Sequence, residues 1–332
     1  MIEAGFWASL RREEGYIPRI SLALVSPEAV KWPLRLERML PLEAPALARL
    51  APAVERPGIH LGVWRENERL AVWGATRHLP AYCMVLETIA PGLLVVKHSR
   101  DESEKFVNVA VFQGEEFKMI DAQFVHQPDC PDLLNALLGF DTEKAAGRPA
   151  SVLIQLAISM RAHGRGGSLL VVPEGSEDWR ASVARPVNYS LAPRFSALAE
   201  LLPLGAAENP DRQATEALGG AVEEIASLTA VDGATVIDDR YGVLAFGAKI
   251  VRRRGAQPVT EVVATEPIEG ARPEVVEPGQ LGGTRHLSAA QFVHDQHDAL
   301  ALVASQDGRF TVFSWSECAR MARAHRIESL LL

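Results

Sequence analysis

Two short motifs in the second half of the chain combine residue types that can act on a phosphate ester. The first is Asp232-Gly233-Ala234, in which a carboxylate precedes two small residues. The carboxylate can bind a metal ion or accept a proton from a hydroxyl group, and the small residues let a ligand press against the backbone. Most Asp-Gly pairs are ordinary turns, so the tripeptide alone is compatible with either interpretation.

The second motif, Gly282–His286, reads Gly-Gly-Thr-Arg-His and precedes a predicted helix that ends near Gln296. A helix start presents free backbone N–H groups, glycines permit close approach, and the side chains of Thr284 and Arg285 add donors. The imidazole of His286 can contact a metal ion or a phosphate oxygen. The motif therefore predicts an anion site, with a capped helix that carries a surface arginine as the alternative.

The elements around these motifs alternate between helical and strand patterns, which predicts an α/β domain with a mixed sheet and helices on both faces. The predicted helices are 151–163, 213–228 and 316–331. The predicted strands are 168–172, 235–237, 243–248, 299–305 and 310–315. The glycine-rich run 164–167 is predicted as a turn, because no lysine and no helix follow it. The segment 252–282 is rich in Pro and Glu and is predicted as a long loop.

The first half of the chain has a different pattern. Residues 58–122 contain six short apolar runs separated by polar clusters, which is typical of a β-rich unit. Helical pieces are predicted at 27–40, 43–50 and 130–139, which makes this half a β-rich α+β domain. The polar stretch 141–149 contains Gly and Pro and suits a domain boundary.

Length and charge limit the possible functions. A chain of 332 residues suggests two domains, and we expect them at 1–149 and 150–332. The formal net charge of −8 argues against a nucleic-acid partner, which would require a basic surface. The three cysteines are far apart and predict no disulfide framework. No apolar stretch is long enough for a membrane span and no leader pattern is seen, so the cytoplasm is the expected location.

The order and spacing of these elements carry a family resemblance. From about Val152 to Trp315 the chain resembles the diadenylate cyclase family, on its Asp-Gly-Ala and Gly-Thr-Arg-His motifs and on Ser305 after the following strand. The resemblance implies an enzyme that joins two ATP molecules into cyclic di-AMP and releases two pyrophosphates with the help of Mg²⁺ or Mn²⁺. It also implies a homo-oligomer in which two cyclase domains face each other.

The resemblance also implies a role for each matching position. Asp232, Arg285 and His286 would be the catalytic residues, with Asp232 and His286 binding the metal ion. The residues that would line the nucleotide are Gly233, Ala234, Gly283, Thr284 and Ser305.

Two departures from the family pattern leave a second interpretation open. Leu287 stands where the family has a second arginine, and Gln306-Asp307 stands in place of two glutamates, although Asp307 can replace one carboxylate. A domain with these changes could be a catalytically weak or inactive nucleotide-binding sensor on the same fold.

The first half carries a separate resemblance. Residues 72–77 (Val-Trp-Gly-Ala-Thr-Arg), followed by 93–98 and 105–111, resemble a sensor domain called DACNV that precedes such cyclases. This resemblance implies that the N-terminal domain regulates the cyclase in response to a ligand that the residues do not identify.

Overall fold

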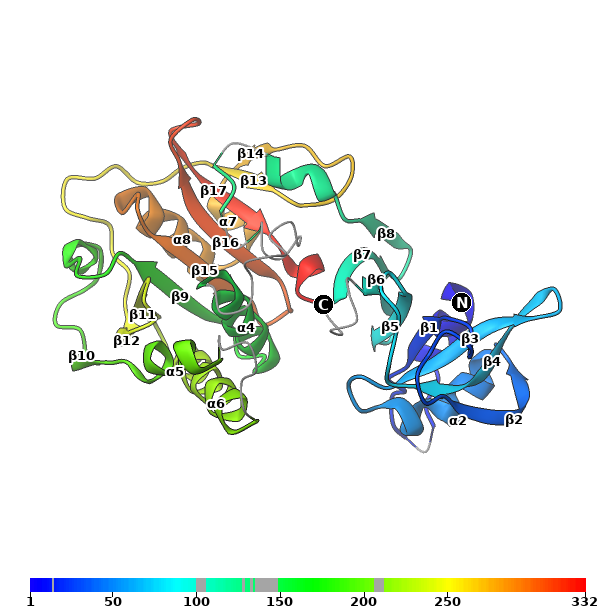
Figure 1. Ribbon diagram of the computed structural model, residues 1–332. Helices are drawn as coiled ribbons and strands as arrows, with labels where there is room; N and C mark the ends of the chain where they lie inside the picture. Colours follow the sequence, from blue (N-terminus) through cyan, green and yellow to red (C-terminus); the bar gives the residue numbers. More distant parts are fainter. Residues whose placement is uncertain (14, 100–105, 127–128, 132–133, 135–148, 206–211) are drawn as a thin grey trace. The chain divides into compact units, whose positions relative to one another are not determined.

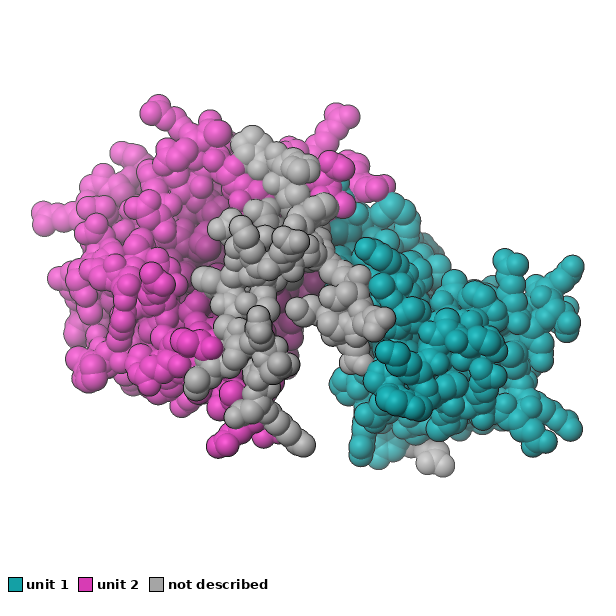
Figure 2. Space-filling model, in the orientation of Figure 1, with its two compact units in different colours: residues 1–121, 332 teal, residues 122–331 magenta. Residues whose placement is uncertain are grey.

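The chain folds into two compact units, Met1–Asp121 with Leu332 and Ala122–Leu331 (Figure 2). The computed structural model describes the chain except for residues 14, 100–105, 127–128, 132–133, 135–148 and 206–211. Each unit contains one mixed sheet with helices, which confirms the predicted α/β class and the β-rich first half. The predicted helix 130–139 and the predicted boundary at 141–149 lie largely outside the described residues.

The first unit is built on an eight-stranded sheet with the order β2-β4-β3-β1-β5-β6-β7-β8 (Figure 1). Its strands are β1 Ser21–Leu24, β2 Leu34–Pro41, β3 His60–Glu66, β4 Arg69–Thr76, β5 Met84–Ala90, β6 Leu93–Ser99, β7 Phe106–Gln113 and β8 Glu116–Met119. Only β1 and β3 run parallel among the described neighbours. The helices α1 (Ile2–Ser9) and α2 (Ala44–Val54) pack on one face, where Leu47 joins Leu22 and Leu61 in one core.

The six predicted runs of the first unit are confirmed as β3 to β8, and the helix predicted at 43–50 is confirmed as α2. The helix predicted at 27–40 is wrong, because residues 34–41 form the edge strand β2. Its pairing with β4 is irregular between Arg35 and Leu40, and most of its side chains are exposed. An edge strand of this kind has no clear period-two alternation, so its sequence does not show its structure.

The second unit is built on a nine-stranded sheet with the order β10-β12-β11-β9-β15-β16-β17-β13-β14. Its strands are β9 Gly167–Val172, β10 Tyr189–Phe195, β11 Ala234–Asp238, β12 Val243–Ala248, β13 Val262–Thr265, β14 Glu274–Val276, β15 Leu300–Ala304, β16 Phe310–Ser316 and β17 Met321–Arg326. Its helices are α4 Pro149–Ala162, α5 Ala197–Gly205, α6 Arg212–Leu228, α7 Pro278–Leu281 and α8 Thr284–Asp295.

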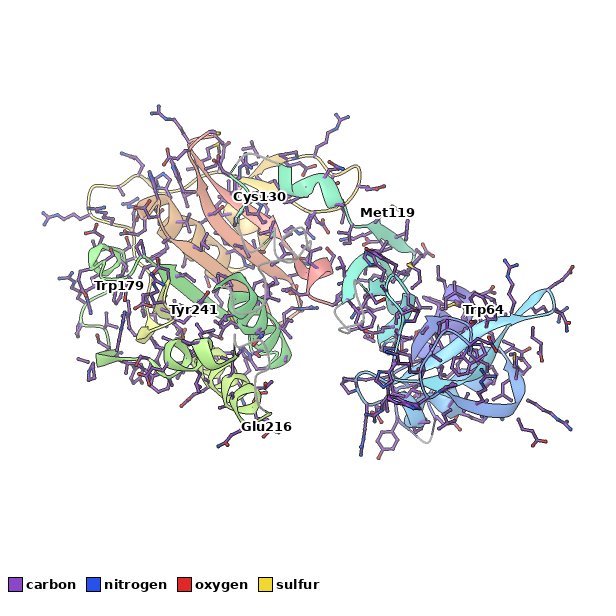
Figure 3. The ribbon with its side chains drawn as sticks, in the orientation of Figure 1. Trp64, Met119, Cys130, Trp179, Glu216 and Tyr241 are labelled. Carbon is purple, nitrogen blue, oxygen red and sulfur yellow. The ribbon has the colours of Figure 1, made fainter. Side chains whose placement is uncertain are left out.

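Helices cover both faces of this second sheet (Figure 1). Leu170 and Val303 belong to one core with Phe292 of α8. The residues next to them along each strand point to the opposite face of the sheet. On that face α4 contacts β15 and packs against α6. Trp179 is buried in this unit, whereas Glu216 of α6 is exposed (Figure 3).

Two predictions for the second unit are corrected by the structure. The predicted helix 316–331 is instead the strand β17, which pairs with β16 and β13, followed by a short 3-10 turn. The segment 252–282 is not a free loop, because it supplies β13 and β14 and is tied to α8. The Arg253 N–H donates to Asp295 Oδ2 at 2.7 Å, and the Val259 N–H donates to Gln291 Oε1 at 2.9 Å.

The structure also gives the state of the cysteines and the character of the helices. The three cysteines are free thiols. No helix in the described part of the chain is long and apolar enough to cross a membrane.

His325 on β17 makes the stability of the second unit depend on pH. It is 1% exposed, and its ring contacts the hydroxyl groups of Thr265 at 2.8 Å and Ser314 at 3.3 Å. Burial, with a smaller effect of Arg323, lowers the pKa of His325 to about 3. The unfolded chain therefore binds a proton that the folded chain excludes once the pH falls below the unfolded pKa, about 6.5.

We expect the free energy of unfolding to fall by about 2 kcal/mol from this residue between about pH 7 and pH 5. Urea unfolding of the wild type and His325→Gln at both pH values measures the effect. The variant should lose that part of the pH dependence, and an equal dependence in both proteins would contradict the assignment.

Candidate functional site

The register of the central strands brings the two motifs to one end of the second sheet. Ala234 at the start of β11 pairs with Ser168 of β9 and with Ala248 at the end of β12. Ala304 at the end of β15 pairs with Gly167 at the start of β9. The residues just beyond these positions therefore leave the sheet at the same end. They are Gly166, Asp232, Gly233, Lys249 and Ser305, and we call this set the Asp232 end of the sheet.

Asp232 is held as an anion by two cations. Lys249 Nζ forms an ion pair with Asp232 Oδ2, and the carboxylate remains 90% exposed. Its hydrogen bond and charge interaction with Lys249, with a smaller effect of Arg285, hold the pKa of Asp232 below its usual range. Asp232 is therefore ionised near neutral pH, and it can accept a hydrogen bond from a hydroxyl group or bind a cation.

Gly233 packs directly against the backbone of β12. Its φ is +119°, and a Cβ atom there would lie 2.4 Å from the carbonyl carbon of Gly247. Gly247 also has a positive φ, and a Cβ atom on it would lie 2.9 Å from Cδ2 of Tyr189. The two glycines thus let the turn at Asp232, the end of β12 and the ring of Tyr189 pack without intervening side chains.

Arg285 connects the second motif to the first. It extends from the first turn of α8, and a Cβ atom on Gly166 would lie 3.0 Å from Arg285 Nη1. This Cβ atom on Gly166 would also lie 3.2 Å from the carbonyl oxygen of Ala304. Gln306 Nε2 donates to the carbonyl oxygen of Arg165 at 3.3 Å, which joins the turn before β9 to the turn after β15. The structure thus brings the half-buried Arg285 to the Asp232 end of the sheet.

The start of α8 is open rather than capped by a side chain. Gly283 is the N-cap residue, and no side-chain hydrogen bond caps the helix. Thr284 is exposed in the first turn, and Leu287 is 46% exposed. The first turn therefore offers N–H groups and the Thr284 hydroxyl to an anion, with an apolar side chain at position 287.

His286 does not join the other site residues at the surface. It is fully buried, and its Nε2 contacts the hydroxyl group of Thr311 at 3.2 Å. A Cβ atom on Gly282 would lie 2.3 Å from His286 Nδ1, so the ring lies directly against the backbone at that glycine. Burial lowers the pKa of His286, which keeps the ring neutral. The expected metal ligand His286 is therefore buried, whereas the other expected ligand, Asp232, is exposed.

In the turn after β15, Ser305 lies at the Asp232 end of the sheet, whereas the Asp307 carboxylate is paired within the turn. The Ser305 N–H donates to the carbonyl oxygen of Arg309 at 2.9 Å, which closes the hairpin turn at the Asp232 end of the sheet. Asp307 Oδ2 lies 3.2 Å from Arg309 Nε, and its Oδ1 accepts a bond from the Arg309 N–H at 3.3 Å. The carboxylate considered as a replacement for the family's glutamate is therefore engaged within its own turn.

Tyr189 is a candidate residue that the sequence did not reveal. Its ring stacks on Phe246 of β12, with ring centres 4.7 Å apart and planes inclined by 4°, and it is 49% exposed. Only the pairing of β10 with β12 brings the two rings together. Strand β10 was not predicted, so no signal in the sequence pointed to this flat surface beside Gly247.

The structure also distinguishes among the basic residues near the site. Lys249 lies at the Asp232 end, whereas Arg253 lies beside Asp295 and Ala299 at the opposite end of the sheet. Arg253, from the run 252–254, therefore supplies no charge to this site. Across the described part of the chain, no group of three or more His, Cys, Asp and Glu side chains could hold a metal ion.

Comparison with known proteins gives one match. A family model described as "Probable sensor domain DACNV" matches residues 1–77, which run from α1 through β4 of the first unit. No curated protein matches the chain. The compact unit continues beyond the match to Asp121. Over residues 1–77 the chain is therefore similar to a probable sensor domain of the DACNV family.

Proposed function

We propose that the second unit is a diadenylate cyclase, which condenses two ATP into cyclic di-AMP and two pyrophosphates under the control of the first unit. The observation that carries the proposal is the meeting of Asp232, Lys249 and Arg285 at one end of the sheet. The DACNV match supports it, because this sensor domain occurs in diadenylate cyclases.

In the proposed reaction each 3′-hydroxyl oxygen attacks the α-phosphorus of the other ATP. The bond from that phosphorus to pyrophosphate breaks, and the hydroxyl proton is released. Asp232 accepts the hydrogen bond from the hydroxyl group and directs its oxygen. Arg285, Thr284 and the open N–H groups of α8 bind the phosphates, while Gly233 and Ala234 leave room for the nucleotide. Catalysis then rests on positioning and on stabilisation of negative charge.

A divalent cation fits this arrangement through Asp232. Mg²⁺ and Mn²⁺ prefer oxygen ligands and are commonly held by one or two carboxylates together with substrate phosphates. Asp232 is exposed and ionised, and it would be the protein ligand. When bound, such a cation supplies neutralisation of phosphate charge. We assign His286 to a positioning role, because its bond to Thr311 fixes the first turn of α8 against β16.

The proposed reaction requires two copies of the second unit, since each binds one ATP. A homo-oligomer with the Asp232 ends facing each other would supply both. Product formation per protein molecule should therefore rise with protein concentration.

Arg285→Ala should raise the dissociation constant for ATP about tenfold or more, because it removes a cation that bonds to phosphate. Calorimetric titration with ATP measures the change. Arg253→Ala is the matched control and should bind ATP like the wild type, because Arg253 lies at the other end of the sheet. Equal losses in both variants would contradict the site.

Tyr189→Ala should weaken ATP binding about tenfold, because we propose that the exposed face of this ring stacks on the adenine. Tyr189→Phe keeps the ring and should retain most of the affinity. Loss of affinity in the phenylalanine variant, or none in the alanine variant, would exclude the stacking role.

The test of the proposed function is incubation of the full chain with ATP and Mn²⁺, followed by mass analysis of the nucleotides. Cyclic di-AMP that increases more than proportionally with protein concentration is the expected result. ATP binding without any cyclic dinucleotide over a wide range of concentrations and metal ions would reject the cyclase.

That negative result would favour a second candidate, a nucleotide-binding sensor with little or no turnover. Leu287 presents an apolar side chain in the first turn of α8, where the family has a cation. The amide group of Gln306 donates to the carbonyl oxygen of Arg165. Leu287→Arg would introduce the second arginine that the cyclase family has at this position. Product formed by this variant and not by the wild type would assign the loss of activity to position 287.

A further inference from the structure

The first unit contains a cavity of the size of a small-molecule site. Its volume is about 570 Å³, within the usual range of about 300–1,000 Å³ for ligand pockets. It is bounded by the starts of β1, β3 and β7, the end of β5 and the residues that follow α2. All the described residues that line it belong to the first unit, so it is separate from the Asp232 end of the second sheet.

Fixed polar side chains form part of the cavity wall. His60 Nδ1 lies 2.7 Å from Ser21 Oγ, and Thr88 Oγ1 accepts a bond from the Ile20 N–H at 2.7 Å. His60 is 2% exposed and Thr88 is 6% exposed. Polar groups that are buried and held by the sheet in this way can orient a ligand with little loss of conformational entropy.

The charges around the cavity favour an anion. Arg19 and Arg56 are exposed and line it, and neither forms an ion pair with a carboxylate of the described residues. Glu87 also lines the cavity, but Lys97 Nζ neutralises it at 2.7 Å. Among the described residues of the lining, two arginines are therefore opposed by the carboxylate of Glu55.

Apolar side chains form the rest of the lining. Ile59, Ile89 and Phe106 are half-buried there, and the ring centre of Phe106 lies 5.7 Å from that of His60. A ligand that fills the cavity would thus place an apolar, preferably flat, group against these side chains.

We propose that this cavity is the ligand site of the sensor unit and that it binds a small organic anion, with a phosphate or carboxylate group on an apolar body. The arginines bind the charged group, and His60 and the hydroxyl groups orient the remainder. The site requires β5 and β7, which lie beyond the segment matched to the sensor family. The proposal does not depend on any activity of the second unit.

The test uses the full chain with ¹³C-labelled isoleucine methyl groups, observed by NMR. Ile59 and Ile89 report on the cavity, and each signal is assigned by an Ile→Val variant. Phenyl phosphate and benzoate are the probes, and benzyl alcohol is their uncharged analogue. We expect at least one of the two anions to shift both signals, and benzyl alcohol to shift them much less. Arg19→Ser and Arg56→Ser should each weaken that binding about tenfold.

Two control variants test where the probes bind. One changes an arginine of the first unit outside the cavity, and the other changes the proposed nucleotide site. Arg69→Ser removes an exposed arginine from the hairpin of β3 and β4, outside the cavity lining, and should bind like the wild type. Arg285→Ala should leave the shifts of Ile59 and Ile89 unchanged. Shifts confined to Ile250, which neighbours Lys249, would show binding only in the second unit and overturn the proposal. Absence of shifts at Ile59 and Ile89, or equal shifts with benzyl alcohol, would also overturn it.

Discussion

Asp232→Asn is expected to reduce cyclic dinucleotide formation about a thousand-fold, while ATP binding changes little. The amide keeps the size of the side chain but loses its charge, so it accepts the hydroxyl hydrogen bond less well and binds a divalent cation poorly. Both effects act on the transition state, where losses of about 10²–10³ for one electrostatic group are usual. The measurement is the initial rate of product formation with saturating ATP and Mn²⁺.

The control for this variant is Glu177→Gln, which removes another exposed carboxylate paired with a cation, Arg180, in the same unit. It should leave the rate unchanged. Circular dichroism should show both variants folded, because the side chain of Asp232 is 90% exposed and contributes no core packing. An Asp232→Asn protein with more than about a tenth of the wild-type rate would contradict the catalytic role proposed for Asp232.

Gly233→Ala is expected to have the largest effect on stability, with a loss of about 3 kcal/mol. At a φ of +119° an L side chain is strained, and its Cβ atom would lie 2.4 Å from the backbone carbon of Gly247. Backbone cannot rotate away as a flexible side chain can, so β11 and β12 must separate. Urea unfolding monitored by circular dichroism measures the change in the free energy of unfolding.

Gly220→Ala is the matched control. Gly220 lies inside α6, where a Cβ atom would meet nothing within 4 Å. Alanine favours the helix there, so the variant should be more stable by about 0.5–1 kcal/mol. If Gly233→Ala were as stable as this control, the tight contact between β11 and β12 would be wrong.

The sequence predicts the second sheet well where strands are short, apolar and joined by tight turns. It fails for residues 316–331, because Ala322, Ala324 and Met321 favour a helix when considered locally. The strand forms because Ala324 pairs with Phe313 of β16 and lies beside Ala264 of β13, contacts that are distant in sequence. Long-range pairing of this kind overrides local propensity.

The candidate site also has parts that the sequence predicts and parts that depend on long-range pairing. The motifs around Asp232 and Arg285 are visible in the sequence, because their residue types carry recognisable chemistry. The partnership of Asp232 with Lys249, and the contact of Arg285 with Gly166, depend on which strands are neighbours in the sheet. The burial of His286 depends on the direction in which α8 presents its first turn, which a motif does not specify.

The outer strands of the second sheet affect how two copies can associate. Strand β10 at one edge contains Pro193, which lacks an N–H group, and its register with β12 shifts between Ser190 and Phe195. Strand β14 at the other edge has only three residues and begins with Glu274. Such edges discourage the addition of a further strand. These edges thus protect copies of this unit from polymerising through continuous sheets.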